Sequence, residues 1–145
     1  MQKKRSTPKV LLTSNSEDET KLCGARLAKQ LKAGDRIFVT GPLGGSFKSG
    51  RHLNFLPRLA QARFLVENFK PNAMIDISDG LSGDLNHILK ESQVGARLDT
   101  AFIPRYKGVS SSQALNDGED FELLFTLSPK SACSLMDWQA QQKSF

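Results

Sequence analysis

The residues best suited to bind a metal ion form a short polar run after a predicted strand. The run is Asp76-Ile77-Ser78-Asp79-Gly80, and it follows the apolar residues 73–75. Alternation along a strand puts Asp76 and Ser78 on one face, with Asp79 at the turn beside them. Two such carboxylates can hold a hard cation, and Mg²⁺ prefers few protein carboxylates together with phosphate oxygens.

Asp76 argues for a functional role, because a carboxylate at the end of an apolar strand is costly to bury unless it is paired or metal-bound. The alternative is structural: Ser78 or Asp79 caps the helix that follows.

A second acidic group lies at 117–122, before an apolar strand. Asp117, Glu119, Asp120 and Glu122 occupy four of these six positions, with Gly118 among them. Such a group focuses negative potential, which suits a cationic substrate group or a metal ion. The alternative is an ordinary acidic turn before a strand.

A glycine-rich segment, residues 41–50, holds four glycines and two serines and follows a predicted strand. Its backbone N–H groups could cradle a phosphate. It is not a Walker A motif, because Phe47 stands where that motif requires a glycine before the lysine, here Lys48. A plain strand-to-helix loop is the alternative.

Four other residues that often serve in sites are assigned to packing or surface roles. His52 and His87 have no convincing partners at ligand spacing in the sequence, and Cys23 and Trp138 are expected to pack.

The elements that must position these residues follow from periodicity and from start and stop signals. In the second helix the apolar stripe is Leu59, Ala62, Leu65 or Val66, and Phe69; in the third it is Leu81, Leu85, Ile88 and Leu89. We predict helices over 16–33, 57–69, 81–89 and from 129 toward 138, strands at 10–12, 37–39, 73–77, 96–99 and 121–127, and an irregular connection over 104–118. This order predicts a layered α/β or α+β domain.

Composition is that of one globular domain: 145 residues, 39% hydrophobic and 24% charged. No apolar run approaches the roughly 20 residues that span a bilayer. Cys23 and Cys133 make neither a disulfide framework nor a zinc motif, so we expect a reduced, cytoplasmic setting.

The net charge of +5 is unevenly distributed. Residues 20–70 carry ten basic and two acidic groups, whereas residues 71–145 carry six basic and ten acidic groups. This asymmetry suggests separate phosphate and metal ligands more than a nucleic-acid surface. The basic half also lacks the aromatic interleaving expected for nucleic-acid binding, so we do not expect a nucleic-acid partner.

Three segments resemble signatures of one enzyme family, in order and at sensible spacing. Residues 34–46, 74–81 and 115–125 are similar to segments of thiamine-monophosphate kinases, and residues 94–99 and 103–104 also fit. The resemblance covers roughly residues 34 to 130. It implies an α+β fold, a layered α/β/α domain with a mixed sheet like the C-terminal domain of aminoimidazole ribonucleotide synthetase.

By this resemblance the function is ATP-dependent phosphorylation of thiamine monophosphate to thiamine diphosphate, with Mg²⁺ as cofactor. Asp76 and Asp79 would bind Mg²⁺, Ser78 would contact ATP, and Glu119 would contact the thiamine substrate. No catalytic residue is assigned, because phosphoryl transfer between two anions depends on metal ions and positioning more than on a strong base.

Members of this family carry a preceding N-terminal domain that supplies most of the metal-binding aspartates and the dimer surface, and we expect this chain to depart from the family by lacking it. We therefore expect a flexible basic tail over 1–9, a strand-helix segment over 10–33, and an incomplete kinase-like domain over 34–145. Residues 15–35 resemble the start of the ATPase of the tRNA threonylcarbamoyladenosine pathway.

The expected ligands are ATP and thiamine monophosphate. The expected partner is a second copy of the chain, in a homodimer, or the N-terminal domain in trans; no membrane is expected. Two alternatives stay open: a non-catalytic remnant that binds nucleotide or thiamine phosphate, and an ATPase-like partner in tRNA modification.

Overall fold

The computed structural model describes residues 9–13 and 32–142. It contains a four-stranded sheet in the order β1-β2-β4-β3, with every neighbouring pair antiparallel. The strands are β1 (Lys9–Thr13), β2 (Arg36–Val39), β3 (Ala73–Asp76) and β4 (Leu123–Leu127). The α+β class is thereby confirmed.

The expected mixed sheet is wrong for these strands. β2 and β3 run parallel to each other, since both are antiparallel to β4, but β4 lies between them. The only parallel pairing among the described residues is an isolated bridge between Leu43 and Arg105.

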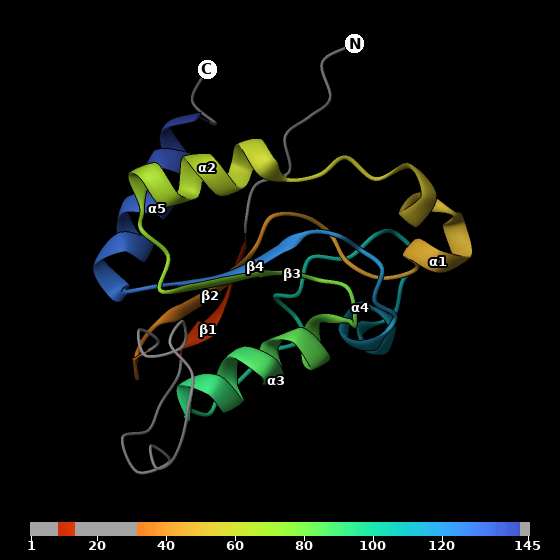
Figure 1. Cartoon of the computed structure of the whole chain (residues 1–145), viewed down its shortest axis with the longest axis horizontal. Helices are drawn as coiled ribbons and strands as arrows, with labels where there is room; N and C mark the ends of the chain where they lie inside the picture. The colour runs from red at the N-terminus through yellow and green to blue at the C-terminus, as the bar shows by residue number, and fades with distance from the viewer. Residues whose placement is uncertain (1–8, 14–31, 143–145) are drawn as a thin grey trace.

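Helices cover both faces of the sheet, which gives three layers (Figure 1). On one side lie α2 (Leu59–Asn68) and α5 (Pro129–Gln142), and on the other lie α3 (Leu81–Ser92) and the short α4 (Ser111–Asn116). α1 (Ser46–Ser49) and the 3-10 helix η1 (Arg51–Asn54) follow the glycine-rich segment at one end.

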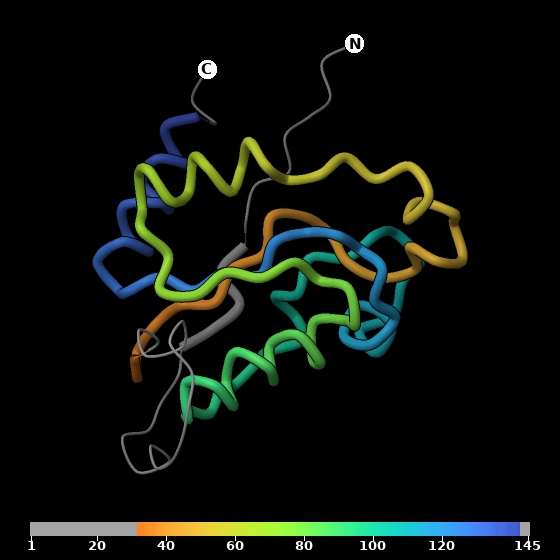
Figure 2. The backbone as a smooth tube through the Cα atoms, viewed as in Figure 1, coloured from red at the N-terminus to blue at the C-terminus, as the bar shows by residue number. Residues whose placement is uncertain are grey.

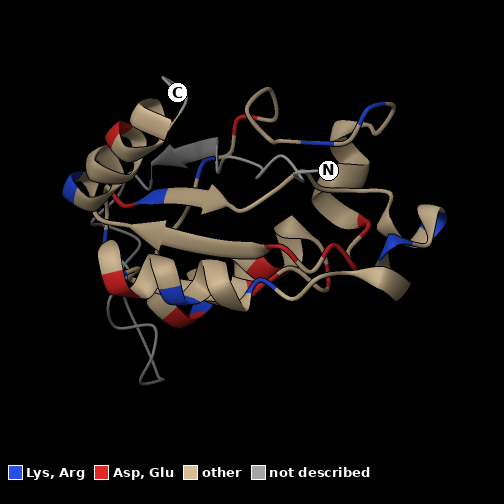
Figure 3. Ribbon diagram, turned by 90° about the horizontal axis from the view of Figure 1, so that it is seen from above, with Lys and Arg blue, Asp and Glu red and all other residues tan. Residues whose placement is uncertain are grey.

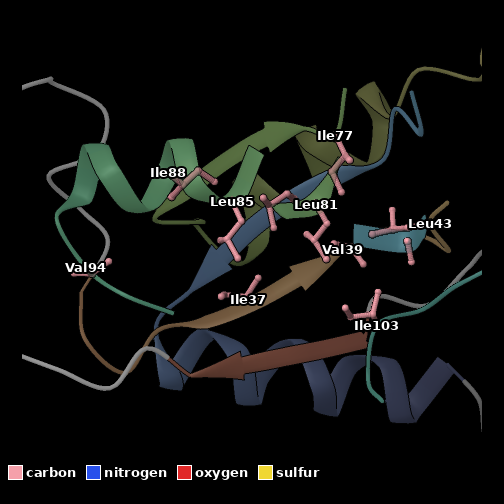
Figure 4. Close-up of a cluster of buried hydrophobic side chains, with 11 residues drawn as sticks. Ile37, Val39, Leu43, Ile77, Leu81, Leu85, Ile88, Val94 and Ile103 are labelled. Carbon is pink, nitrogen blue, oxygen red and sulfur yellow. The ribbon is translucent and has the colours of Figure 1, made fainter. Parts of the chain in front are cut away.

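The two faces of the sheet form two cores, as the alternation of side chains along a strand requires. Ile37 and Val39 of β2 face α3, whereas Phe38, between them, faces α2 and α5. Figure 4 shows the first core, where the side chains of β2 meet those of α3. Its buried members are Ile37, Val39, Leu43, Ile77, Leu81, Leu85, Ile88, Val94, Ile103, Ala114 and Leu124.

The second core is built around two stacked rings. Phe38 and Phe125 are paired across the strands, with ring centroids 5.3 Å apart, and both are fully buried. The helices contribute Leu65, Phe69, Ala132 and Leu135. Trp138 packs against Phe64 at this core, as its predicted packing role requires.

Most predicted elements are found in the structure at the expected positions. The strands at 10–12, 37–39, 73–77 and 121–127 correspond to β1 to β4, and three of the predicted helices to α2, α3 and α5. The predicted helix over 16–33, together with Cys23, falls outside the described residues apart from its last two positions.

Two predictions about the connections are wrong. Residues 96–99 form no strand: Ala96 and Leu98 pack against the first core and Arg97 is exposed, but the backbone pairs with no described strand. Residues 104–118 contain α4, whose capping box is formed by Ser110 and Gln113. The Ser-x-x-Gln spacing signals such a helix start.

The predicted apolar stripe of α2 is wrong at Leu59. Leu65 and Phe69 are buried, so Leu65 is the one of the two alternatives, Leu65 and Val66, that faces the core; Leu59 is 76% exposed and Val66 is 52% exposed. These two residues are seven apart, so they share a face of the helix that points away from the sheet.

Among the described helices, none is both long enough and apolar enough to cross a bilayer.

Candidate functional site

The three segments singled out in the sequence meet at one end of the sheet. β2 and β3 end there and β4 begins there, since Val39 pairs with Leu124 and Asp76 pairs with Leu123. The loops that continue from these strand ends carry many of the chain's acidic residues, drawn red in Figure 3. We call residues 41–45, 76–80 and 117–122 the strand-end loops.

Backbone hydrogen bonds join the Asp76–Gly80 run to the acidic segment. The amide of Glu119 donates to the carbonyl of Ser78 over 2.8 Å, and the amide of Phe121 donates to the carbonyl of Ile77 over 2.9 Å. A Cβ on Gly118 would lie 2.5 Å from the Ser78 carbonyl oxygen, so only glycine fits there. The two predicted functional segments are therefore held in direct contact.

The acidic segment has an unusual backbone. Gly118, Glu119 and Phe121 have φ values of 70°, 55° and 49°. A left-handed conformation costs a residue with a side chain on the order of 1–3 kcal/mol, and it persists only where the surroundings fix it. Here the hydrogen bonds to residues 77 and 78 fix it, so the position of Glu119 is set by backbone contacts.

The glycine-rich segment does not present all its backbone N–H groups to a phosphate. The amide of Gly44 donates to Asp120 Oδ2 over 2.8 Å, and the amide of Gly45 donates to Asp117 Oδ2 over 2.9 Å. The predicted phosphate cradle is thus not formed by these two amides. The segment is instead a strand-to-helix loop that two carboxylates attach to the acidic segment.

Asp120 is a buried carboxyl group with incomplete pairing. Its side chain is 2% exposed; Oδ1 accepts no hydrogen bond and lies 3.9 Å from Arg51. Burial raises the pKa of Asp120 to about 6, while the Gly44 amide and the Arg51 charge pull it down. Protonation of Asp120 therefore affects the hydrogen bond with Gly44 that joins loop 41–45 to loop 117–122.

Glu122 is buried in an ion-pair network. Arg58 bonds both of its carboxylate oxygens, with a distance of 2.9 Å from Nε to Oε2. The Thr40 hydroxyl donates to Oε2, and the Leu123 amide donates to the Thr40 hydroxyl oxygen. The hydrogen bond with Glu122 raises the pKa of Arg58 above its ordinary value.

The four acidic residues of 117–122 therefore have different roles. Asp117, Asp120 and Glu122 are bonded to the protein's own donors. Across residues 32–142, no side-chain hydrogen bond or ion pair is found for the Glu119 carboxylate. Glu119 is thus the member of this group whose charge is available to a ligand.

Asp76 and Asp79 are exposed, so the cost of burying Asp76 that we expected does not arise. The helix-cap alternative is not observed either, because the N-cap of α3 is Gly80 and no side chain caps it. Asp84 satisfies backbone donors of this loop instead, since its Oδ2 accepts the amides of Ser78 and Asp79 over 3.0 and 3.1 Å.

Asp84 is a site residue that the sequence reasoning missed. It is 2% exposed, and burial raises its pKa, as do the nearby charges of Asp79 and Asp76. Ligand atoms of Asp79, Asp84 and His87 lie within 4.8 Å of one another, so His87 does have acidic neighbours. The i, i+3 spacing of Asp84 and His87 on a helix was the available signal.

These carboxylates fit a hard cation. Asp76 and Asp79 offer exposed oxygen atoms, and each raises the pKa of the third carboxyl group, Asp84, through its charge. A cation that binds there would relieve this repulsion, and oxygen donors are what Mg²⁺ takes.

The fold and this arrangement of loops define the class of protein. Residues 32–142 match the family model described as AIR synthase related protein, C-terminal domain, and the chain belongs to that family.

The similar proteins within this class are thiamine-monophosphate kinases. The chain is 39% identical to that of Rhodopirellula baltica over 117 residues, which covers 72% of this chain and 37% of the relative. It is 36% identical to that of Escherichia coli K12 over 124 residues, with 66% and 38% covered. The chain thus spans well under half of these two relatives.

The similar solved structures are also thiamine monophosphate kinases. The thiamine monophosphate kinase from Aquifex aeolicus has a TM-score of 0.59 at 26% identity, with 71% of this chain and 44% of that chain covered. AaThiL complexed with AMPPCP and TMP has a TM-score of 0.56 at 28% identity, with 72% and 42% covered. These comparisons do not support the resemblance of residues 15–35 to a tRNA-modification ATPase, and most of that segment lies outside the described residues.

Proposed function

We propose that this chain is the substrate-binding half of a thiamine-monophosphate kinase, in which ATP phosphorylates thiamine monophosphate to thiamine diphosphate in the cytoplasm. Asp76 and Asp79 would hold Mg²⁺, Ser78 would contact ATP, and Glu119 would contact the thiamine ring. The relatives at 36–39% identity carry this enzyme name, and one similar structure was solved with AMPPCP and TMP.

One observation carries the proposal. The Glu119 amide donates to the Ser78 carbonyl over 2.8 Å, so the residue proposed for the thiamine substrate adjoins those proposed for ATP and Mg²⁺. Phosphoryl transfer requires donor and acceptor side by side, and catalysis of this step is mainly positioning and charge stabilisation.

Each residue has a distinct role in the proposed reaction. Mg²⁺, when bound, neutralises charge that develops on the transferring phosphoryl group. Asp76 and Asp79 place carboxylate oxygens at the end of β3, and Asp84 orients their loop by accepting the amides of Ser78 and Asp79. The half-buried Glu119 carboxylate would attract the cationic thiazolium ring.

The chain spans 37–41% of the length of three kinase relatives that are 37–39% identical to it, so turnover would require a further unit, provided by a separate N-terminal domain or by a homodimer. The same short coverage favours a second candidate function, a module that binds nucleotide and thiamine phosphate without turnover.

The test supplies this chain with the part of the Rhodopirellula baltica relative outside the matched segment. It then measures thiamine diphosphate formation from ATP and thiamine monophosphate, alongside calorimetric binding of each ligand. The proposal expects formation of product that falls at least 100-fold in Asp76→Asn. The control is Asp137→Asn, which removes an exposed carboxylate on α5, on the side of the sheet opposite α3. Binding without turnover would establish the second candidate, and no binding of either ligand would refute both.

A further inference from the structure

One continuous stretch of the chain exposes large apolar side chains. Between residues 47 and 59, Phe47, Leu53, Leu56 and Leu59 are 67–76% exposed, and Phe55 is 45% exposed. We call these five residues the apolar surface. Single exposed apolar residues are ordinary, whereas five within thirteen positions of the chain make a candidate interaction site.

The apolar surface lies on the stretch of chain that runs from the glycine-rich segment into α2. It begins in α1, continues through η1, and ends at the first residue of α2. Figure 2 shows the connection between η1 and α2 (yellow) running as open chain along the outside of the molecule.

Two contacts tie this surface to the candidate site. Phe55 stacks on Phe121 of the acidic segment, with ring centroids 4.2 Å apart. Arg58, next to Leu59, is bonded to Glu122. A unit that covered the apolar surface would therefore lie against the acidic strand-end loop.

Charge indicates the kind of partner. Residues 36–66 contain five basic residues and no acidic ones. Arg51 and Arg58 already face Asp120 and Glu122, and Arg36 begins β2 at the end opposite the strand-end loops. The positive charge left to a partner is that of Lys48 and Arg63, which are exposed in α1 and α2. A second copy of this chain would bring the same positive charge to the contact, and like charges disfavour association. An apolar face with carboxylates opposite Lys48 and Arg63 is complementary to this surface.

We propose that the apolar surface is the docking site of a second folded unit with an apolar face rimmed by carboxylates, and that this unit covers one side of the strand-end loops. The inference rests on the proposed function for the identity of that unit: the part of the kinase relatives that this chain does not match, more than half of their length. Beyond the proposed function, the inference names the residues that make the contact, which are those of the apolar surface.

The test uses the part of the Rhodopirellula baltica relative outside the matched segment as the probe, co-expressed with this full chain and confirmed as folded by a cooperative thermal transition. The test variant is Leu53→Glu/Leu56→Glu. The control is Phe102→Glu/Met136→Glu, which adds the same charge at apolar residues that are 56% and 49% exposed elsewhere.

We expect the probe to copurify with the wild-type chain and the control, with an affinity at least 50-fold weaker for the test variant. Retention by all three chains, or by none, would overturn the inference. A wild-type dimer in sedimentation that Leu53→Glu/Leu56→Glu dissociates would also overturn it, in favour of a second copy.

A second experiment joins the two units in one chain, in case the separate probe binds too weakly to copurify. In a chimera, residues 32–142 replace the matched segment of the Rhodopirellula baltica enzyme. We expect one thermal transition for the chimera and for its control variant, and two transitions when Leu53→Glu/Leu56→Glu uncouples the units. A single unchanged transition in the test variant contradicts docking. A coupled chimera without turnover would refute the proposed function and leave the docking surface standing.

Discussion

The strand-end loops and the apolar surface differ in how many of their side chains are hydrogen-bonded or buried within this chain. In the strand-end loops, carboxylates accept backbone amides, Glu122 is paired with Arg58, and Gly118 fits with no space for a Cβ. On the apolar surface, side chains such as Leu53 are three-quarters exposed. The loops are thus complete as a scaffold, whereas the apolar surface is complete only with a partner.

This contrast suggests how the proposed enzyme divides its work. The scaffold of the strand-end loops does not require the partner, because its hydrogen bonds are within the chain. The carboxylates left over, Asp76, Asp79 and Glu119, are the groups that ligands can use. The following predictions test whether the two regions are as different as this account requires.

The largest effect is expected at Gly118. Gly118→Ala adds a Cβ 2.5 Å from the Ser78 carbonyl oxygen at a φ of 70°, so the two loops must separate. We expect a loss of about 3 kcal/mol or more in the free energy of unfolding, from strain together with a lost joint. Urea denaturation measures it.

The matched control for this change is Gly108→Ala. Gly108 has a φ of 81° but nothing within 4 Å of an added Cβ, so only the backbone strain applies, about 1–2 kcal/mol. Equal losses for the two variants would show that the loop joint is not tightly packed.

A smaller loss is expected for Glu122→Gln. The substitution removes the negative charge facing Arg58, whose side chain is 25% exposed and so retains some hydration. Breaking such a partly buried pair should cost about 2 kcal/mol in unfolding free energy. The Thr40 hydroxyl belongs to the same network, because it donates to Glu122 and accepts from the Leu123 amide. Thr40→Val should cost less in unfolding free energy, about 1 kcal/mol. A Glu122→Gln variant as stable as wild type would contradict the network.

Asp120 should make stability depend on pH. Its pKa is about 6 in the folded chain and about 3.9 when unfolded, so the folded state binds more protons between these values. Stability contributed by this group therefore falls as the pH rises from about 4 to about 6. Asp120→Asn should remove this pH dependence. The unfolding free energy of the variant minus that of wild type should therefore be higher at pH 7 than at pH 4, by about 1–3 kcal/mol.

Urea midpoints of the two proteins at both pH values provide the measurement. If the stability difference between Asp120→Asn and wild type is the same at pH 4 and pH 7, the pKa of Asp120 is not raised in the folded chain.

The smallest effect on stability is expected on the apolar surface. Leu53→Glu/Leu56→Glu changes side chains that are 74% and 67% exposed, so unfolding free energy should stay within about 0.5 kcal/mol of wild type. Thermal unfolding of the isolated chain measures it. A loss above 2 kcal/mol would show that these residues already pack within the chain.

The sequence was sufficient for the core and for much of the site. Alternation at Ile37-Phe38-Val39 and the helical spacing of Leu81, Leu85 and Ile88 predict which faces are buried, because burial imposes those periods directly. The three functional segments were each found from composition. Their meeting at one end of the sheet follows from the strand pairing, which local patterns do not encode.

What the sequence could not show depends on contacts between distant residues. Nothing near Asp117 or Asp120 indicates that the amides of Gly45 and Gly44 will occupy them, and nothing near Glu122 indicates Arg58. Leu59 fits the apolar stripe of α2 by its spacing, yet it is 76% exposed, because burial depends on which side of the helix meets the sheet. The antiparallel sheet likewise depends on β4 inserting between β2 and β3.

The most direct test of the central claim is calorimetric titration of ATP into this chain, with and without Mg²⁺. The account predicts binding that requires Mg²⁺, that is at least 10-fold weaker in Asp79→Asn, and that is unchanged in Asp137→Asn. Asp79 is exposed, so its substitution should leave the fold intact, which a thermal transition checks. ATP binding that is equally strong without Mg²⁺, or in Asp79→Asn, would contradict the account.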